Sequence, residues 1–293
     1  MKILHNIHIW ISINKKKLSL FILWNRVFIF YLLNRKKIKN SDSYLEYRYL
    51  LRNGVSCFPY SFVEHYKKMR VNVFYDDIYP YVLENNLKIY FNSNWNTEKV
   101  EKYYREISLE QNINSPHCYY HKNIDYSNYD IAIDIGAAEG NFSTFIVKYI
   151  NKIYLYEKDD VWYDCLKRTF QQYEDKVEII KKNVSNFDDD ISVKLDSINQ
   201  YYDKNILVKI DVEGNELNVL EGMLKILSQN KFITLLVCTY HKQNDEVILN
   251  EFLTNLGYSN SFSNGYMCYF YDKSIKKPFL RKALMFSTKN EIK

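Results

Sequence analysis

The chain has 293 residues, 47% apolar and 26% charged, which is enough for one large domain or one domain with an added segment. Its five cysteines are odd in number, widely spaced and without a C-x-x-C pair, which disfavours a zinc site and a disulfide framework and favours a reduced, cytoplasmic compartment. Residues 1–40 hold nine basic residues and no acid. The whole chain has a formal net charge of +5, so residues 41–293 carry a net charge of 5 − 9 = −4. A body with this charge has no obvious nucleic-acid patch.

The first 40 residues are predicted to form a basic and apolar extension. Its apolar run, Leu18 to Leu33, is interrupted by Asn25-Arg26 and is shorter than the roughly 20 residues that a bilayer span needs. No small-residue cleavage site follows, so a secretory signal is not indicated. Because lysines flank the run on both sides, we expect peripheral contact with the inner face of a membrane. A poorly ordered extension or an upstream start codon is the alternative.

Residues 41–124, rich in tyrosine and charge, are predicted to be a small α+β lead-in or cap. Two strands, Arg70–Tyr75 and Leu87–Phe91, are predicted to pair with each other through turns. Apolar residues at helical spacing then predict a helix over Glu98–Gln111.

Strands and helices alternate over residues 125–293, which predicts an α/β domain with an open, mostly parallel sheet covered on both faces. The predicted strands are Tyr129–Ile135, Lys152–Tyr156, Val177–Lys181, Ile206–Ile210 and Phe232–Thr239. The predicted helices are Asn141–Tyr149, Val161–Tyr173, Glu216–Leu227 and Asp245–Leu256. A late strand, Tyr266–Tyr271, is predicted to form a hairpin with Ser259–Phe262. Ligands of such sheets bind at the carboxyl ends of the strands.

The first strand of this domain runs into a glycine-rich turn with the pattern Asp134–x–Gly136–x–Ala138–x–Gly140. Gly136 permits a sharp turn and a close approach of backbone to ligand, and Gly140 lets the next helix start beside that ligand. A dinucleotide-binding turn would show three glycines, G-x-G-x-x-G, whereas this turn has two spaced by four. The pattern therefore favours S-adenosylmethionine (SAM), and these four residues are its predicted binding residues.

Two polar residues after the next strands extend the predicted cofactor site. Glu157 follows the second strand, where an acid binds both ribose hydroxyls of an adenosine ligand. A solvated acid before a turn is the alternative interpretation. Asn183, just past the third strand, is the candidate for the adenine edge, because its amide can donate and accept.

Three motifs in fixed order carry a family resemblance. They are Asp134–Gly140, Leu195-Asp196-Ser197-Ile198, and Val208-Lys209-Ile210-Asp211-Val212-Glu213-Gly214-Asn215-Glu216-Leu217 followed by Leu220 and Gly222. Over about residues 125–260 the chain resembles FkbM-type methyltransferases. Outside that range, Glu110-Gln111…Ser115-Pro116-His117 and Thr239–Asp245 resemble one bacterial, largely uncharacterised branch of the family. The resemblance implies a class I, Rossmann-like, seven-stranded sheet with its last strand antiparallel, and O-methylation of sugars or polyketides.

The candidate catalytic residues follow strands four and five. An alcohol acceptor must lose a proton as the methyl group arrives, so a positioned base helps. Asp211 and Glu213 end strand four and His241 ends strand five, where each faces the expected crevice. Acids at a helix start and a structural histidine are the alternatives. A divalent metal held by the three is a further one that their spacing does not demand. His117 is a candidate lid residue.

The sequence thus predicts a cytoplasmic SAM-dependent methyltransferase acting on a hydroxyl of a sugar, glycan or glycolipid precursor. The alternatives are N-methylation, a small-molecule natural product as acceptor, and a non-catalytic SAM-binding regulatory module. No nucleic-acid partner is expected.

Overall fold

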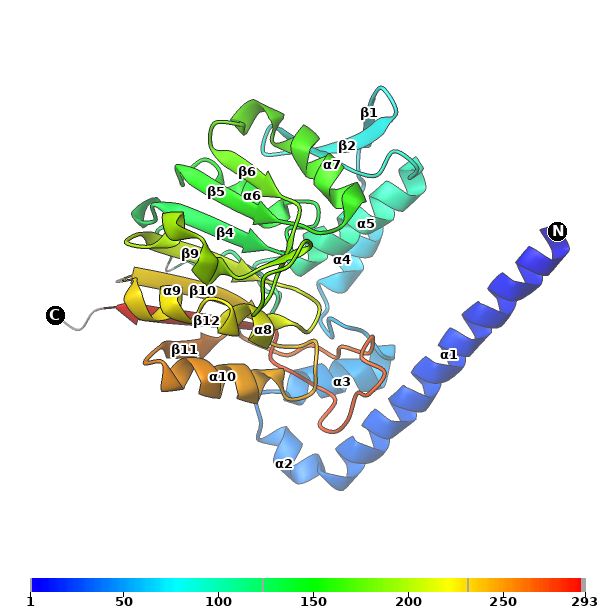
Figure 1. The fold of residues 1–293 in the computed structure, drawn as a ribbon. Coiled ribbons are helices and arrows are strands. Elements are labelled where there is room, and N and C mark those ends of the chain that lie inside the picture. The colour runs from blue at the N-terminus through cyan, green and yellow to red at the C-terminus, as the bar shows by residue number, and fades with distance from the viewer. Residues whose placement is uncertain (1, 123, 231, 291–293) are drawn as a thin grey trace.

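A seven-stranded sheet forms the centre of the computed structural model, which describes residues 2–290 apart from 123 and 231, and side chains from residue 14 apart from 16 and 290 (Figure 1). The strand order is β11-β12-β10-β9-β4-β5-β6. The strands are β4 (Ile131–Ile135), β5 (Lys152–Tyr156), β6 (Val177–Ile180), β9 (Asn205–Ile210), β10 (Phe232–Cys238), β11 (Ser259–Phe262) and β12 (Leu284–Asn290). β12 runs antiparallel to both of its neighbours, β10 and β11, whereas the other adjacent strands of this sheet are parallel. The predicted fold class is therefore confirmed, including the antiparallel last strand.

The central strands of the sheet are buried on both faces because most of their residues are apolar. In β4, Ala132 belongs to one buried cluster with Leu155 and Leu207, while Ile133 belongs to a second cluster with Val208. The helices of this domain are α6 (Asn141–Ile146), α7 (Asp160–Thr169), α8 (Glu216–Glu221), α9 (Leu224–Gln229) and α10 (Asp245–Asn255). The first strand of the domain, β4, lies between β5 and β9, so chain order reverses there. In open α/β sheets, ligand-binding crevices form at such a switch point.

The helix predicted over Glu216–Leu227 is wrong as one element, because it is broken into α8 and α9. A Cβ on Gly222 would lie 2.0 Å from the carbonyl oxygen of Ser185, so the backbone packs directly on a neighbouring loop. The carboxylate of Asp196 then accepts hydrogen bonds from the N–H groups of Lys225 and Ile226 and starts the second helix.

The prediction that Tyr266–Tyr271 forms a hairpin with Ser259–Phe262 is also wrong. Ser259–Phe262 is a strand, but its partner is β12, with Phe262 opposite Met285. Of residues 266–271, Met267 makes one isolated bridge to Arg281 and the rest form no strand. The apolar residues of β12 fill the slot between β10 and β11, which leaves the alternating segment 266–271 to run as a loop beside the strand ends.

The lead-in segment contains a small antiparallel sheet of β1 (Phe74–Asp76), β2 (Tyr79–Glu84) and β3 (Leu87–Tyr90). The predicted pairing of the two outer strands is wrong, because β2 lies between them. The strand β2 was not predicted because it contains Pro80, and proline is disfavoured inside a strand. The helix α5 (Thr97–Glu110) confirms the prediction for that stretch, and α4 (Val63–Lys68) packs beside it. The division of the chain at residues 40 and 124 stays a prediction.

The N-terminal helix α1 (Lys2–Leu33) extends away from the body, as Figure 1 shows. It is followed by α2 (Arg35–Lys39) and α3 (Tyr44–Asn53), and it touches the body through α3 and the loop around residue 279. Within residues 2–290, 123 and 231 aside, no helix has the length and apolar content to cross a bilayer.

Candidate functional site

The loop between β4 and α6 has the backbone shape that its glycines suggested. Gly136, Ala138 and Gly140 all have positive φ, at +76°, +47° and +80°. A Cβ on Gly136 would lie 1.9 Å from the carbonyl oxygen of Asp211, so the loop is packed tightly against the end of β9. Glu157 stabilises the unusual Ala138 conformation by accepting its N–H at 2.9 Å.

Asp134 is fully buried and supports this loop from beneath. Its carboxylate lies 3.0 Å from Lys209 Nζ and accepts a hydrogen bond from Ser143 Oγ at 2.7 Å. Lys209 Nζ also donates to the carbonyl oxygen of Gly136 at 2.6 Å. Burial alone would lower the pKa of Lys209, but Asp134 and Asp211 raise it above its ordinary value. The buried ion pair therefore fixes the position of the glycine-rich loop.

A cavity of about 580 Å³ opens where this loop meets the carboxyl end of β9. Its walls include the loop residues Gly136, Ala137, Ala138 and Glu139, then Lys209, Asp211 and Glu213 from β9 and beyond, Tyr103 and Glu110 from α5, and His117, Tyr119, Tyr240 and Tyr269. Of the predicted cofactor residues, Gly136 and Ala138 line the cavity, whereas Asp134, Gly140, Glu157 and Asn183 do not. Gly140 packs instead toward Leu166 and Phe170 of α7.

Glu157 directly follows β5, and Asn183 comes after β6 in a separate two-stranded sheet. The Glu157 carboxylate accepts from the N–H groups of Ala138 and Asp159, at 2.9 and 2.8 Å, and is buried. Asn183 starts the short strand β7 (Asn183–Val184), which pairs with β8 (Ser192–Val193). Their roles toward ribose and adenine stay predictions.

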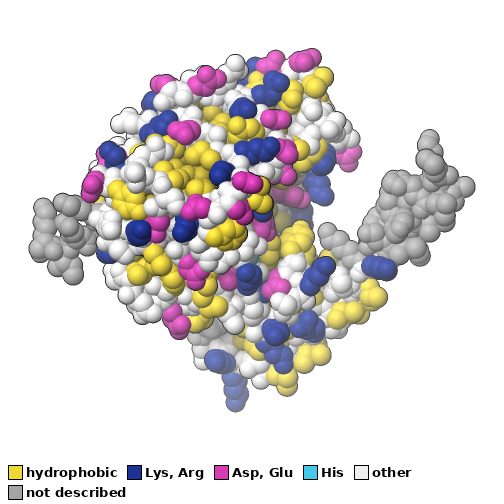
Figure 2. Space-filling view, in the orientation of Figure 1, with side chains coloured by type: hydrophobic (Ala, Val, Ile, Leu, Met, Phe, Trp, Pro, Cys, Tyr) yellow, Lys and Arg dark blue, Asp and Glu magenta, His cyan; other side chains and the backbone are white. Residues whose placement is uncertain are grey.

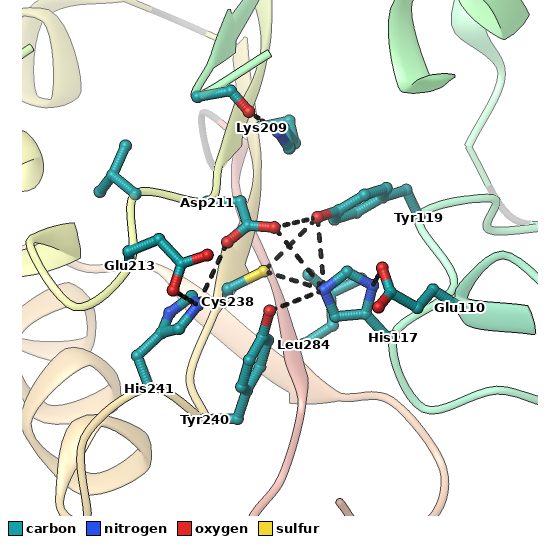
Figure 3. A network of polar contacts seen from close by, with 12 residues as sticks. Glu110, His117, Tyr119, Lys209, Asp211, Glu213, Cys238, Tyr240, His241 and Leu284 are labelled. Carbon is teal, nitrogen blue, oxygen red and sulfur yellow. Dashed lines mark hydrogen bonds and ion pairs between the residues drawn. The ribbon is translucent and has the colours of Figure 1, made fainter. Parts of the chain in front are cut away.

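Asp211 is the centre of a polar network at the cavity floor (Figure 3). Tyr119 Oη donates to Asp211 Oδ2 at 2.6 Å, and His117 Nε2 lies 3.6 Å from the same oxygen. The other oxygen, Oδ1, lies 3.4 Å from His241 Nε2. Burial alone would raise the pKa of Asp211, but the nearby His117 and the charges of Lys209 and His241 outweigh it and hold the pKa well below its usual range. Asp211 is therefore ionised at neutral pH.

His241 is a cation in this arrangement. Its Nδ1 lies 2.9 Å from Glu216 Oε1, and Glu216 also accepts from the N–H groups of Val212 and Gly214. Burial would lower the pKa of His241, but Glu216, Asp211 and Glu213 together raise it to about 9. At neutral pH His241 thus stabilises the Asp211 carboxylate, and it can accept a proton only above about pH 9.

Glu213 and His117 differ sharply in exposure. The Glu213 side chain is 80% exposed, lies 3.6 Å from His241 Nε2 and accepts from Tyr269 Oη at 3.2 Å. His117 is buried and bonded through Nε2 to Tyr240 Oη at 3.1 Å, so it forms part of the cavity wall.

Glu110, Tyr119 and Tyr240 line the cavity and were not among the predicted site residues. Burial raises the pKa of Glu110, His117 lowers it, and the neighbouring acids Asp211 and Glu139 raise it further, to about 7. The resemblance of the Glu110…His117 stretch to one branch of the family was the available signal for Glu110. Tyr240 lies in the Thr239–Asp245 stretch, which carries the same resemblance. For Tyr119 the abundance of tyrosine masked any signal.

The metal alternative stays a prediction. Among the residues that the structure describes, two trios bring ligand atoms within 4.8 Å of one another: His117 with Asp211 and Cys238, and Asp211 with Glu216 and His241. Asp211 belongs to both trios and already accepts a hydrogen bond from Tyr119. Glu216, in the second trio, already accepts hydrogen bonds from two backbone N–H groups.

The sequence profile described as "Methyltransferase FkbM domain" matches residues 79–259, more than half of the chain. The chain belongs to the FkbM methyltransferase family. The match begins in β2, so the family's domain includes α5 and with it Glu110. No match was found among proteins of curated function.

Solved structures of methyltransferases resemble the fold at low sequence identity. The methyltransferase FkbM of Methylobacillus flagellatus KT is 15% identical with a TM-score of 0.42, over 66% of this chain and 55% of that one. This chain therefore spans little more than half the length of that protein. The N-terminal domain of human METTL16 in complex with SAH is 14% identical with a TM-score of 0.39, over 69% of this chain and 75% of that one.

Proposed function

We propose that this FkbM-family methyltransferase transfers the methyl group of SAM to a hydroxyl of a sugar, glycan or glycolipid precursor. The observation that carries this proposal is that the glycine-rich loop and the ionised Asp211 line one cavity, and that a second cavity adjoins it. A loop for the donor and a polar centre for the acceptor thus lie within one crevice.

The residues around the loop fit SAM. A volume of about 580 Å³ is within the range of small-molecule sites. The backbone from Gly136 to Glu139 presents little side-chain bulk at its first three positions, which suits close approach by the amino-acid end of SAM. Each oxygen of Glu157 accepts one hydrogen bond and retains a lone pair for a ribose hydroxyl. When bound, SAM supplies an electrophilic methyl group.

The second cavity, of about 540 Å³, suits a sugar acceptor. It shares Glu106, Glu110, Tyr240, Tyr269 and Tyr271 with the first cavity. Tyr49, Tyr66 and Phe58 supply flat apolar surfaces, and Asn53, Ser56 and Lys102 supply hydrogen-bonding groups. Sugars present both apolar ring faces and hydroxyls, so this mixed lining supports a glycan over a purely apolar acceptor.

Two carboxylates divide the acceptor chemistry in this proposal. Asp211, which stays ionised, accepts a hydrogen bond from the acceptor hydroxyl and holds its oxygen toward the methyl group. Its low basicity makes it a poor final proton acceptor. The proton passes from Asp211 to Glu110 through the His117 ring, whose Nε2 lies 3.6 Å from Asp211 Oδ2 and whose Nδ1 lies 4.0 Å from Glu110 Oε2. Glu110, with a pKa of about 7, holds the proton near neutral pH. His241 keeps Asp211 charged throughout.

Calorimetric titration with S-adenosylhomocysteine (SAH) tests the cofactor site. Micromolar binding should weaken tenfold or more in Glu157→Ala, equivalent to about 1.4 kcal/mol. The exposed Glu174→Ala should bind like the wild type. A folded wild-type chain that binds neither SAM nor SAH refutes the proposal.

Transfer of labelled methyl groups from SAM to a panel of free and lipid-linked sugars tests the acceptor. An O-methyl ether resists alkali, whereas a methyl ester releases its label as methanol. Alkali-stable label on a sugar without an amino group supports the proposal. Alkali-labile label, or label confined to amines, contradicts it.

A further inference from the structure

The helix α1 has an inner face that fixes how it lies on the body. Leu23 and Val27 are buried against α3 and the loop around Phe279. Trp24 Nε1 donates to the carbonyl oxygen of Leu50 at 3.0 Å, and Arg26 donates to the carbonyl oxygen of Ile275 at 3.0 Å. These contacts determine which residues of α1 face away from the protein.

The opposite face of α1 is apolar and has no covering element among the described residues. Seven large apolar side chains are between 37% and 75% exposed there: Leu18, Phe21, Ile22, Phe28, Ile29, Leu32 and Leu33. At helical spacing they fall within about 140° of arc, opposite Leu23 and Val27. Figure 2 shows hydrophobic and basic side chains side by side along this part of the chain. A stripe of this kind on a surface marks an interaction site.

The charges around the stripe select its partner. The first acid of the chain is Asp42, so residues 1–41 carry basic charge only. Lys15 and Lys17 lie exposed before the stripe, and Arg35, Lys36, Lys37 and Lys39 lie exposed after it. A second copy of the same face would bring like charges together. Anionic lipid headgroups instead complement the basic residues while the apolar stripe enters the acyl boundary.

We propose that this face of α1, together with α2, lies in the interface of an anionic membrane. The exposed apolar side chains of the stripe favour burial against a partner over contact with water. The basic residues on both sides disfavour packing against the same face of a second copy. Electrostatic attraction between the basic residues and the lipid surface adds to the burial of the stripe.

A row of cavities joins this helix to the polar network at Asp211. A cavity of about 440 Å³ lies between α1 and the loop that follows residue 269, with Leu23 and Arg26 on one wall. It shares Phe270 and Tyr271 with the cavity of about 540 Å³, which in turn adjoins the Asp211 cavity. On the proposed function, on which this step rests, the row lets a membrane-anchored acceptor reach Asp211 with its head while its lipid stays at α1.

Co-sedimentation of the full chain with vesicles tests the membrane proposal. We expect binding to vesicles of phosphatidylglycerol and phosphatidylcholine and at least tenfold weaker binding to phosphatidylcholine alone. Phe21→Asp/Ile29→Asp should weaken binding to the anionic vesicles tenfold or more, and Lys36→Glu/Lys37→Glu should weaken it and reduce its salt dependence. Val247→Asp/Ile248→Asp, a comparably exposed apolar pair on α10, should bind like the wild type.

Calorimetric titration with SAH on the same variants separates this proposal from the proposed function. Unchanged SAH affinity shows that the variants are folded, so lost vesicle binding then belongs to α1. Vesicle binding without SAH binding leaves the membrane proposal standing and refutes the function. Absent vesicle binding of the wild type, equal binding of the α1 and α10 variants, or light scattering that shows an α1-dependent dimer without vesicle binding overturns the membrane proposal.

Discussion

Tyr119 Oη and Asp211 Oδ2 are joined by a 2.6 Å hydrogen bond across 92 residues of sequence. The bond connects the segment before β4 to the carboxyl end of β9, and so closes the cavity floor. Tyr119→Phe should lower the free energy of unfolding by about 1.5–3 kcal/mol, because a buried carboxylate loses a donor. Urea denaturation measures this. Tyr149→Phe, at a half-exposed tyrosine, should change stability by less than about 0.5 kcal/mol; equal losses in both variants would show that the bond is unimportant.

Gly136 and Gly257 offer a matched pair for the glycine-rich loop. Both have positive φ, but a Cβ would lie 1.9 Å from the Asp211 carbonyl oxygen at Gly136 and meets nothing within 4 Å at Gly257. Gly136→Ala should weaken SAH binding more than tenfold because the loop must move. Gly257→Ala should cost only the backbone strain and leave SAH affinity intact. Similar affinities for the two variants, by calorimetry, would mean that the loop does not bind the cofactor.

The buried Lys209–Asp134 pair should be coupled energetically. Lys209→Met leaves Asp134 unpaired in the core and should destabilise the chain by about 3–5 kcal/mol. The double variant Lys209→Met/Asp134→Leu should recover at least half of that loss in urea denaturation. Lys152→Met removes a partly exposed partner of Glu178 on the neighbouring strand and should cost under about 1 kcal/mol. Additive losses in the double variant would argue against the coupling.

His241 should make stability depend on pH between neutral and alkaline conditions. Its pKa is raised from 6.5 to about 9 in the folded state, so its contribution is fully present below about pH 6.5 and is lost as pH rises through about 9. The melting temperature of the wild type should therefore fall over this range more steeply than that of His241→Gln. The exposed His65→Gln should keep the wild-type slope. Parallel slopes for wild type and His241→Gln would refute the raised pKa.

Glu110 should set the pH dependence of methyl transfer. A base with a pKa of about 7 is deprotonated as pH rises, so the rate of the wild type should increase from pH 6 to 8 and then level off. Glu110→Gln should reduce the rate 10- to 100-fold or more and flatten this rise, while SAH affinity stays within about threefold. Initial rates across that range, with the sugar acceptor that the labelling panel identifies, measure both effects. An unchanged profile in Glu110→Gln would assign the proton to another group.

Local pattern sufficed for much of the central sheet. The strand Lys152–Tyr156 has the predicted bounds, because a short apolar run between turns has few other solutions in an α/β chain. Asp211 and His241 meet as expected, since the carboxyl ends of parallel strands β9 and β10 share one edge. In contrast, β12 was missed because its place between β10 and β11 depends on pairing with strands distant in sequence.

The sequence by itself determined the fold class, the family and the glycine-rich loop, because these depend on periodicity and on short motifs whose backbone demands are local. Only the tertiary structure decided that Glu110 and Tyr119 border the cavity, since both come from the segment before β4. It also decided that His241 is a cation, because a pKa depends on burial and on charges that Glu216, Asp211 and Glu213 bring together. The tertiary structure likewise decided which apolar residues of α1 face outward, because these are known only once the inner residues are packed.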